Sequence, residues 1–181
     1  DVYKRQVLRT WRDRVATGML PSEISEHRLN PSYSSPEPSL WYIVASYEYF
    51  RASYRQGRTI DPEEREEVKD SMIQILQSFI DHRHKEAYMD EDNLLAEAHL
   101  GLKQDGPIET VKRVHVQALW ICALWIAARI DKKRWWDLYL LARDEFDRAF
   151  WFEEKGYLYK SIIRTPNKTL QRVHSISMEQ V

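Results

Sequence analysis

The sequence predicts an all-α protein built as part of a ring of helical hairpins. Strand-like alternation of apolar and polar residues is scarce. Helices that are apolar on nearly all sides alternate along the chain with amphipathic helices, and each apolar helix follows a long irregular segment. An apolar helix has to be enclosed by other elements, whereas an amphipathic helix faces water on one side. A bundle around one central buried helix is the competing architecture, but it does not account for the alternation.

The first half of the chain contains the first pair of helices. A short helix is expected over 7–16, and a loop rich in Pro and Ser follows over 18–38. The next helix, 40–55, begins with six apolar residues. The segment Asp61-Pro62-Glu63-Glu64 then supplies an N-cap, a proline in the first turn and acidic residues where a helix starts. The helix that it opens is amphipathic, with an apolar stripe of Val68, Met72, Ile75, Leu76, Phe79 and Ile80.

The second half repeats this order. The segment 87–112 is expected to be mostly irregular, the helix 114–130 is apolar nearly all round, and the helix 133–150 is amphipathic. Gly156, which lies between aromatic residues, indicates a tight turn or a short hairpin within 153–162. The two apolar helices would form the inner wall of the ring, and the two long segments before them would emerge at the same rim.

Composition excludes several classes of function. The chain has 181 residues, with 27 basic and 28 acidic side chains and no basic stripe, so we expect no nucleic-acid partner. The longest apolar run, 118–128, is about half the length that spans a bilayer, so we expect no membrane partner. His82 and His84 are two residues apart and do not share a helix face, and no glycine-rich phosphate loop is present. We therefore expect no metal and no organic cofactor. The expected location is the cytoplasm.

The ends of the sequence indicate a fragment. The chain starts at Asp1 rather than Met, and Asp1-Val-Tyr-Lys-Arg-Gln6 resembles a translated remnant of a sequencing adapter. We expect residues 1–6 to be non-native and residues 7–181 to form a single partial domain that is cut at both ends.

Five motifs carry a resemblance to a known family. They are Gly18-Met-Leu-Pro21, Tyr33-Ser-Ser-Pro-Glu-Pro-Ser-Leu-Trp41-Tyr42, Met89-Asp-Glu-Asp-Asn-Leu-Leu95, Val114-His-Val-Gln-Ala-Leu-Trp120, and Phe150-Trp151 with Gly156-Tyr-Leu-Tyr159. In this order they resemble motifs of the amylo-α-1,6-glucosidase domain of glycogen debranching enzymes, a six-hairpin glycosidase. The similarity runs from about Gly18 to Asn167. It implies part of an (α/α)6 toroid and hydrolysis of an α-linked glucan or oligosaccharide by two carboxyl groups.

The chain departs from the family at its acidic positions. Glu37 stands where the family has Asp, and His115 stands where it has Glu. The family's Thr-Trp-Met-Asp, whose Asp is the expected general acid, is missing. Either Asp105 takes its place after a small gap, or Gln104 occupies the position and cannot act as an acid. The family's base is expected beyond Val181. The other acidic residues in predicted loops are Glu23, Glu26, Asp90, Asp92, Glu97 and Glu109, and for each of them a solvated surface charge is the simpler interpretation.

The resemblance thus implies a carbohydrate-active protein. The expected roles are general acid for Asp105 and sugar contact for Tyr33, Glu37, Trp41, Gln117 and Trp120. A helix cap for Glu37 and core packing for the tryptophans are the competing interpretations. Two other functions stay open at this point: a catalytically inactive homologue that binds carbohydrate or serves as a structural module, and a plain helical interaction domain.

Overall fold

The protein contains helices and antiparallel sheets, as a computed structural model shows for residues 2–15, 18–22, 32–99, 109–165 and 169–174. The helices of this described part are α1 (Val2–Arg12), α2 (Glu37–Arg55), α3 (Pro62–Ile80), α4 (Val114–Ile130) and α5 (Lys132–Phe150). Its strands are β1 (Ala87–Met89), β2 (Leu95–His99), β3 (Glu109–Arg113), β4 (Trp151–Phe152), β5 (Tyr157–Leu158), β6 (Ser161–Arg164) and β7 (Leu170–Val173).

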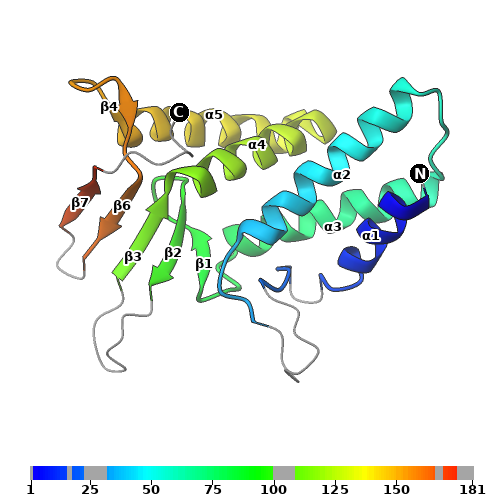
Figure 1. The fold of residues 1–181 in the computed structure, drawn as a ribbon, viewed down its shortest axis with the longest axis horizontal. Helices are drawn as coiled ribbons and strands as arrows, with labels where there is room; N and C mark the ends of the chain where they lie inside the picture. The colour runs from blue at the N-terminus through cyan, green and yellow to red at the C-terminus, as the bar shows by residue number, and fades with distance from the viewer. Residues whose placement is uncertain (1, 16–17, 23–31, 100–108, 166–168, 175–181) are drawn as a thin grey trace.

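The predicted all-α fold, and with it the (α/α)6 toroid, is therefore wrong for this chain. Five strands form one antiparallel sheet in the order β1-β2-β3-β6-β7, and β4 and β5 form a second, two-stranded sheet. In Figure 1 the larger sheet lies at one end of the helices, where α4 begins directly after β3. The segment 87–112, which we expected to be irregular, contains β1, β2 and all of β3 except its last residue.

The strands were not predicted because they are short and because their composition is not typical of strands. Strands β1 and β2 have three and five residues, and Ala and Glu are depleted in strands generally. Two side chains buried in the larger sheet are charged, Glu97 in β2 and Lys112 in β3. Each of them has charged partners within the fold, and such partners are not visible in a single-sequence pattern.

The helices agree more closely with the prediction from the sequence. Helix α4 has the predicted bounds, and α2 begins three residues before the expected Leu40. The predicted cap at Asp61 is present, and the structure shows a second one at Asp131. Asp61 accepts a hydrogen bond from the backbone N–H of Glu63 at the start of α3, and Asp131 accepts one from the N–H of Arg134 at the start of α5. The predicted turn at Gly156 joins β4 to β5, and its φ of +68° is one that glycine adopts without strain.

The main core lies between the helices. Helix α4 packs against α2, α3 and α5, and its Trp120 meets Phe79 of α3 edge to face, with ring centroids 6.2 Å apart. A smaller core fills the space between the start of α4, the end of α5 and the sheet. Its buried residues are Leu94, Val114, Phe150, Tyr159 and Ile162. Because α4 contributes to both cores, the position of its first turn is fixed from two sides.

Helix α1 is held to α3 by ion pairs. Glu64, which is buried, accepts hydrogen bonds from Arg5 at 2.8 Å and from Arg9 at 3.3 Å, and Arg12 pairs with Glu67. The helix includes residues 2–6, which we expected to be non-native. That expectation, and the expected single domain over 7–181, stay predictions.

Candidate functional site

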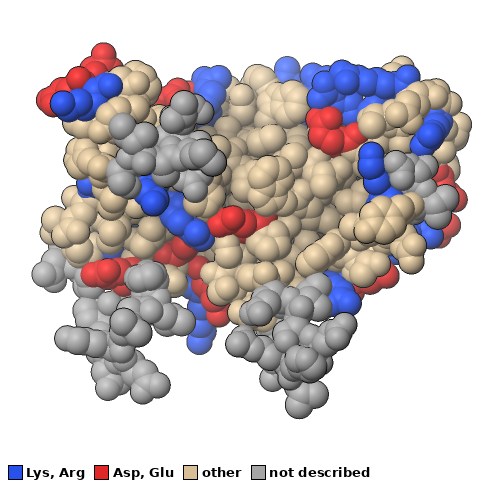
Figure 2. Space-filling view, in the orientation of Figure 1, with Lys and Arg blue, Asp and Glu red and all other residues tan. Residues whose placement is uncertain are grey.

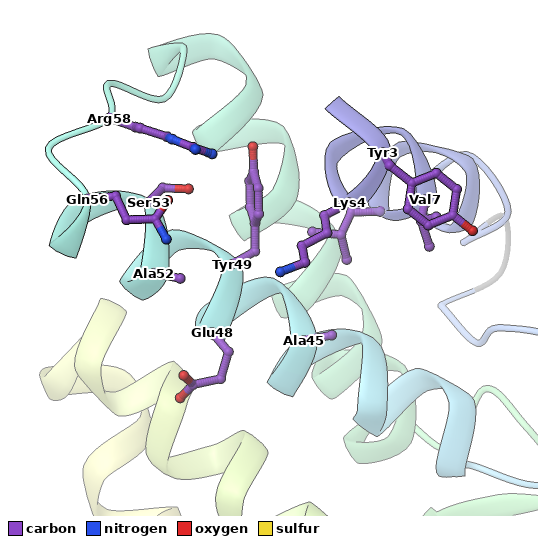
Figure 3. Close-up of a pocket in the computed structure, with 11 residues that line it drawn as sticks. Tyr3, Lys4, Val7, Ala45, Glu48, Tyr49, Ala52, Ser53, Gln56 and Arg58 are labelled. Carbon is purple, nitrogen blue, oxygen red and sulfur yellow. The ribbon is translucent and has the colours of Figure 1, made fainter. Parts of the chain in front are cut away.

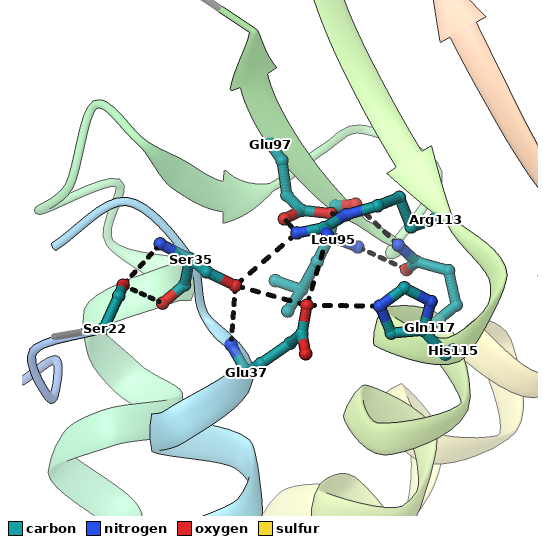
Figure 4. Close-up of polar contacts among 8 residues, drawn as sticks. All are labelled: Ser22, Ser35, Glu37, Leu95, Glu97, Arg113, His115 and Gln117. Carbon is teal, nitrogen blue, oxygen red and sulfur yellow. Dashed lines mark hydrogen bonds and ion pairs between the residues drawn. The ribbon is translucent and has the colours of Figure 1, made fainter.

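The first turns of α2 and α4 meet side by side. Glu37 is the first residue of α2 and His115 is the second residue of α4, and the Glu37 Oε1 atom lies 3.1 Å from the His115 Nε2 atom. Figure 4 shows the two side chains pointing toward one another from the two helix starts. Two of the sequence motifs, 33–42 and 114–120, thus come together at one place in the fold.

The start of α2 is set by its prolines. Pro36 is the N-cap residue and Pro38 lies in the first turn, where the missing N–H leaves no hydrogen bond unmade. Glu37 between them places a carboxylate at the positive end of the helix dipole, which stabilises the negative charge. This is the capping role considered from the sequence. It is compatible with an exposed carboxylate, since the Glu37 side chain keeps 31% of its surface accessible.

Arg113 connects Glu37 to the sheet. It is the N-cap residue of α4, and its Nη1 atom lies 3.2 Å from Glu37 Oε1. Its Nε atom donates to Glu97 Oε2 at 3.0 Å, and its Nη2 atom pairs with the other oxygen of the same carboxylate. The pKa of Arg113 is raised, first by the hydrogen bond to Glu97 and further by the charges of Glu97 and Glu37, against the effect of burial. The guanidinium is therefore a permanent positive charge between two carboxylates.

Strand register explains why Arg113 meets Glu97. Glu97 of β2 lies opposite Val111 of β3, and Arg113 is two residues further along β3 and thus on the same face. Lys112 lies on the other face of the sheet. Its Nζ atom contacts Asp90 at 2.7 Å and Asp92 at 2.5 Å. The two faces of β3 thus carry separate charge clusters, and only the one around Arg113 reaches the helix starts.

Serines attach a distant loop to this cluster. The backbone N–H of Ser35 donates to Ser22 Oγ at 2.8 Å, and the N–H of Glu37 donates to Ser35 Oγ at 3.3 Å. Ser35 Oγ also lies 3.4 Å from Glu37 Oε1 and 3.5 Å from Arg113 Nη2. We call the group Ser35, Glu37, Glu97, Arg113 and His115 the rim cluster (Figure 4).

Gln117 and Trp120 lie beneath the rim cluster and are buried. The Gln117 side chain accepts from the Leu95 N–H and donates to the Leu95 carbonyl, both at 2.8 Å. Trp120 Nε1 donates to the Asn93 carbonyl at 2.9 Å. Both side chains are 0% exposed. Their polar atoms thus hold the β1–β2 turn and the start of β2 against α4.

Trp41 and Tyr33 flank the start of α2. Trp41 lies one turn after Glu37 and is 56% exposed, and it lines a cavity of about 250 Å³ together with Leu20 and Pro38. The four-residue spacing places Trp41 on the same face of α2 as Glu37. Tyr33 is partly buried and packs against the main core. Asp105, Glu23 and Glu26 lie outside the described residues.

The structure adds residues that the motifs did not single out. Ser22, Ser35 and Arg113 belong to the polar network of Figure 4, although the motifs implied no role for them. We expected Glu97 to be a solvated loop charge, and it is instead a buried residue of β2 that is paired with Arg113. Asp90 and Asp92 are likewise paired, with Lys112. The adjacency of Arg113 to the motif 114–120 is the one signal in the sequence that pointed to it.

A second cavity lies between α1 and α2. It has a volume of about 470 Å³, and Figure 3 shows Tyr3, Lys4 and Val7 of α1 facing Ala45 and Tyr49 of α2 across it. None of its lining residues belongs to the five motifs. Its wall includes residues 3 and 4, which belong to the segment that we expected to be non-native.

The rim cluster offers hydrogen-bond donors and acceptors side by side. Glu37 supplies carboxylate oxygens that accept, whereas Arg113 and His115 supply N–H groups that donate. Among the described residues, no group of three or more His, Cys, Asp and Glu side chains is arranged to hold a metal ion. No helix in the same part of the chain is long and apolar enough to cross a membrane.

Comparison with known proteins supports the resemblance in the motifs. Residues 3–174 match the family described as amylo-alpha-1,6-glucosidase, which covers nearly the whole chain. Neither the curated proteins nor the solved structures gave a significant match. Since the family match extends over far more than half of the sequence, the chain belongs to the amylo-alpha-1,6-glucosidase family.

Proposed function

We propose that the chain binds an α-linked glucan at the rim cluster and takes part in hydrolysis of its α-glucosidic bonds. The observation that carries this proposal is the contact between Glu37 and His115. It joins two motifs of a carbohydrate-active family at partly exposed polar side chains, and an exposed tryptophan lies one helical turn away.

The chemistry of the cluster suits a sugar. A sugar hydroxyl both donates and accepts, so it can donate to the Glu37 carboxylate and accept from Arg113 or His115. Hydrogen bonds to charged groups are stronger than those between neutral groups, which favours binding at such a site over the general surface. Trp41 offers a flat apolar ring, against which the C–H face of a sugar ring can pack.

The buried residues enter the proposal as positioning residues. Gln117 and Trp120 hold the backbone at Leu95 and Asn93, and that backbone leads into the strand that carries Glu97. Glu97 in turn orients Arg113. Direct sugar contact by Gln117, Trp120 and Tyr33 stays a prediction, and for the first two it would require the ligand to reach beneath the rim cluster.

Hydrolysis needs an acid in addition to the binding residues. A general acid has to hold a proton that it can transfer to the leaving oxygen. Glu37 and Glu97 both contact Arg113, which favours their role as hydrogen-bond acceptors. We therefore retain Asp105 as the proposed acid.

Titration calorimetry with isomaltotriose, an α-1,6-linked glucan, tests the binding proposal. We expect Glu37→Gln to weaken binding about tenfold, because the substitution removes a charged acceptor but keeps the shape. Glu48→Gln on the exposed part of the same helix is the matched control and should bind like the parent chain. Equal affinities for all three chains would exclude Glu37 as a sugar contact.

A catalytically inactive, carbohydrate-binding homologue is the second candidate. The pairing of both rim carboxylates with Arg113 favours it, since both are engaged as hydrogen-bond acceptors of a permanent cation. Assays of isomaltose and branched-glucan hydrolysis separate the two functions. The assay uses a protein that extends beyond Val181 to the expected base. Loss of its hydrolysis in Asp105→Asn would support the enzyme, whereas binding without any hydrolysis by that longer parent protein would support the inactive homologue.

A further inference from the structure

A third cavity lies at the opposite end of α2 and α4 from the rim cluster. It has a volume of about 780 Å³ and is enclosed by the last turns of α2 and α4, the α2–α3 connection and the first half of α3. This volume is within the range of sites that bind small molecules. We call it the basic cavity.

Positive charge distinguishes this cavity. Five cationic side chains line it, and no carboxylate among the described residues does: Arg51, Arg58, Arg65, Lys69 and Arg129. Arg51 pairs with Glu48 at 2.7 Å and Lys69 pairs with Glu66 at 2.6 Å. Within the described part of the chain, Arg58, Arg65 and Arg129 have no carboxylate partner. In Figure 2, Lys and Arg gather over the end of α2 that leads to α3.

Helix dipoles explain the positions of only some of these cations. The C-terminal ends of α2 and α4 are partially negative, and they stabilise cations such as Arg58 and Arg129 nearby. Arg65 is the fourth residue of α3 and therefore lies near the positive end of that helix, where a cation is disfavoured. Lys69, one turn further along α3, faces the same cavity. A cation at the position of Arg65 therefore does not stabilise α3, whereas it would attract an anionic ligand.

Aromatic rings form another part of the wall. Tyr47, Phe50 and Tyr54 line the cavity, and Tyr54 is 85% exposed. The ring of Tyr47 packs against Trp125, and that of Phe50 packs against Tyr49. Tyr54 makes no such ring contact within the described residues. Its face is thus open for a ring of the ligand to pack against.

We propose that the basic cavity binds a phosphate ester of a small ring compound. The phosphate oxygens would accept hydrogen bonds from Arg65, Lys69 and Arg129, since guanidinium groups present N–H donors that match phosphate oxygens in pairs. The ring would lie against Tyr54. This site shares no residue with the rim cluster, so the inference does not depend on the proposed glucan site.

Titration calorimetry at low ionic strength tests this proposal with four probes: inorganic phosphate, glucose 6-phosphate, phenyl phosphate and neutral glucose. We expect both esters to bind more tightly than inorganic phosphate and glucose not to bind at this site. Tighter binding of glucose 6-phosphate would identify a sugar phosphate, and tighter binding of phenyl phosphate an aromatic one. Added salt should weaken binding by screening the charges.

Variants locate the site. Arg65→Gln and Arg129→Gln should each weaken binding of the tighter ester at least tenfold. Arg143→Gln should not, because Arg143 is an exposed arginine of α5 that pairs with Asp144 and does not line the cavity. Tyr54→Ala should weaken binding of the esters and leave that of inorganic phosphate unchanged. If Arg65→Gln lowers the unfolding midpoint, Lys69→Gln replaces it.

Three outcomes would overturn the proposal. They are the absence of binding by any phosphate probe, equal affinities for glucose and glucose 6-phosphate, and equal effects of Arg65→Gln, Arg129→Gln and Arg143→Gln on ester binding.

Discussion

Glu37 and His115 are separated by 78 residues in the sequence, yet the Glu37 Oε1 atom lies 3.1 Å from the His115 Nε2 atom at the paired starts of α2 and α4. By the resemblance of the two motifs, Glu37 stands where the family is expected to have Asp and His115 where it is expected to have Glu. The Asp-to-Glu change lengthens one side chain, and the Glu-to-His change replaces a second carboxylate with a group that can bond to the first. The two departures from the family thus form one contact.

Glu37→Gln should have little effect on stability. The side chains of Glu37, Arg113 and His115 all keep between 29% and 38% of their surface accessible, so solvent screens the ion pairs. We expect the free energy of unfolding in urea to fall by about 0–1 kcal/mol. A loss above about 3 kcal/mol would instead identify Glu37 as a structural residue, and a weakened sugar affinity would then not locate the binding site.

Gln117→Leu should be strongly destabilising. The substitution keeps an apolar body in the core but leaves the buried N–H and carbonyl groups of Leu95 without their side-chain partner. Each unsatisfied buried group costs about 1–3 kcal/mol, so we expect a loss of about 2–4 kcal/mol in urea unfolding. Gln171→Leu, at an exposed position of β7, should stay within about 0.5 kcal/mol of the parent chain. Equal effects of the two substitutions would contradict the positioning role of Gln117.

Gly18→Ala should also destabilise the fold. Gly18 has a φ of +86°, and a Cβ atom added there would overlap the Cβ of Ser78 on α3, which cannot rotate away. The left-handed backbone costs about 1–2 kcal/mol for a residue with a side chain, and the overlap adds about 1–3 kcal/mol. Gly57 has a φ of +65° but open space around it, so Gly57→Ala should show the backbone cost alone. Thermal unfolding of both variants measures the difference, and no difference would exclude the close approach of the 18–22 segment to α3.

Asp90→Asn tests the charge cluster on the other face of β3. Burial is the largest influence on Asp90 and would raise its pKa, but the hydrogen bond from Lys112 and the neighbouring charges outweigh it, so that the pKa lies below its ordinary value of 3.8. The ionised form is therefore favoured by folding. Its contribution is fully present above pH 3.8 and is lost as the pH falls through the folded-state pKa.

Asp90→Asn should accordingly lower the free energy of unfolding by about 1–3 kcal/mol at pH 7. The difference from the parent chain should shrink below pH 3.8. A gap between Asp90→Asn and the parent that is constant from pH 7 to pH 3 would contradict the assignment.

Helices were predictable because their signals are local. The Asp61-Pro62 start, the apolar run of 114–130 and the turn at Gly156 each depend on residues within a few positions of one another. The five-stranded sheet depends instead on pairs far apart in the chain, such as Lys112 with Ile162, and its buried charges break the apolar alternation that marks a strand.

The residues of the candidate site that lie in a motif were predictable, and those brought in by strand pairing were not. Glu37 was identified by its motif, and the proximity of the motifs 33–42 and 114–120 followed from the expectation of a common rim. Arg113 and Glu97 were not identified, because their importance comes from strand register between β2 and β3. The burial of Gln117 and Trp120 likewise depends on the β1–β2 turn, which the sequence pattern did not reveal.

Hydrogen–deuterium exchange with and without isomaltotriose tests the central claim, that the paired starts of α2 and α4 bind the glucan. The first backbone N–H groups of a helix have no acceptor within that helix, so those without an acceptor elsewhere exchange quickly and report directly on a ligand that covers them. We predict slower exchange in peptides that cover 35–42 and 113–117, with no change in peptides from 136–147 of α5. Slower exchange confined to other segments, with both helix starts unaffected, would contradict the account.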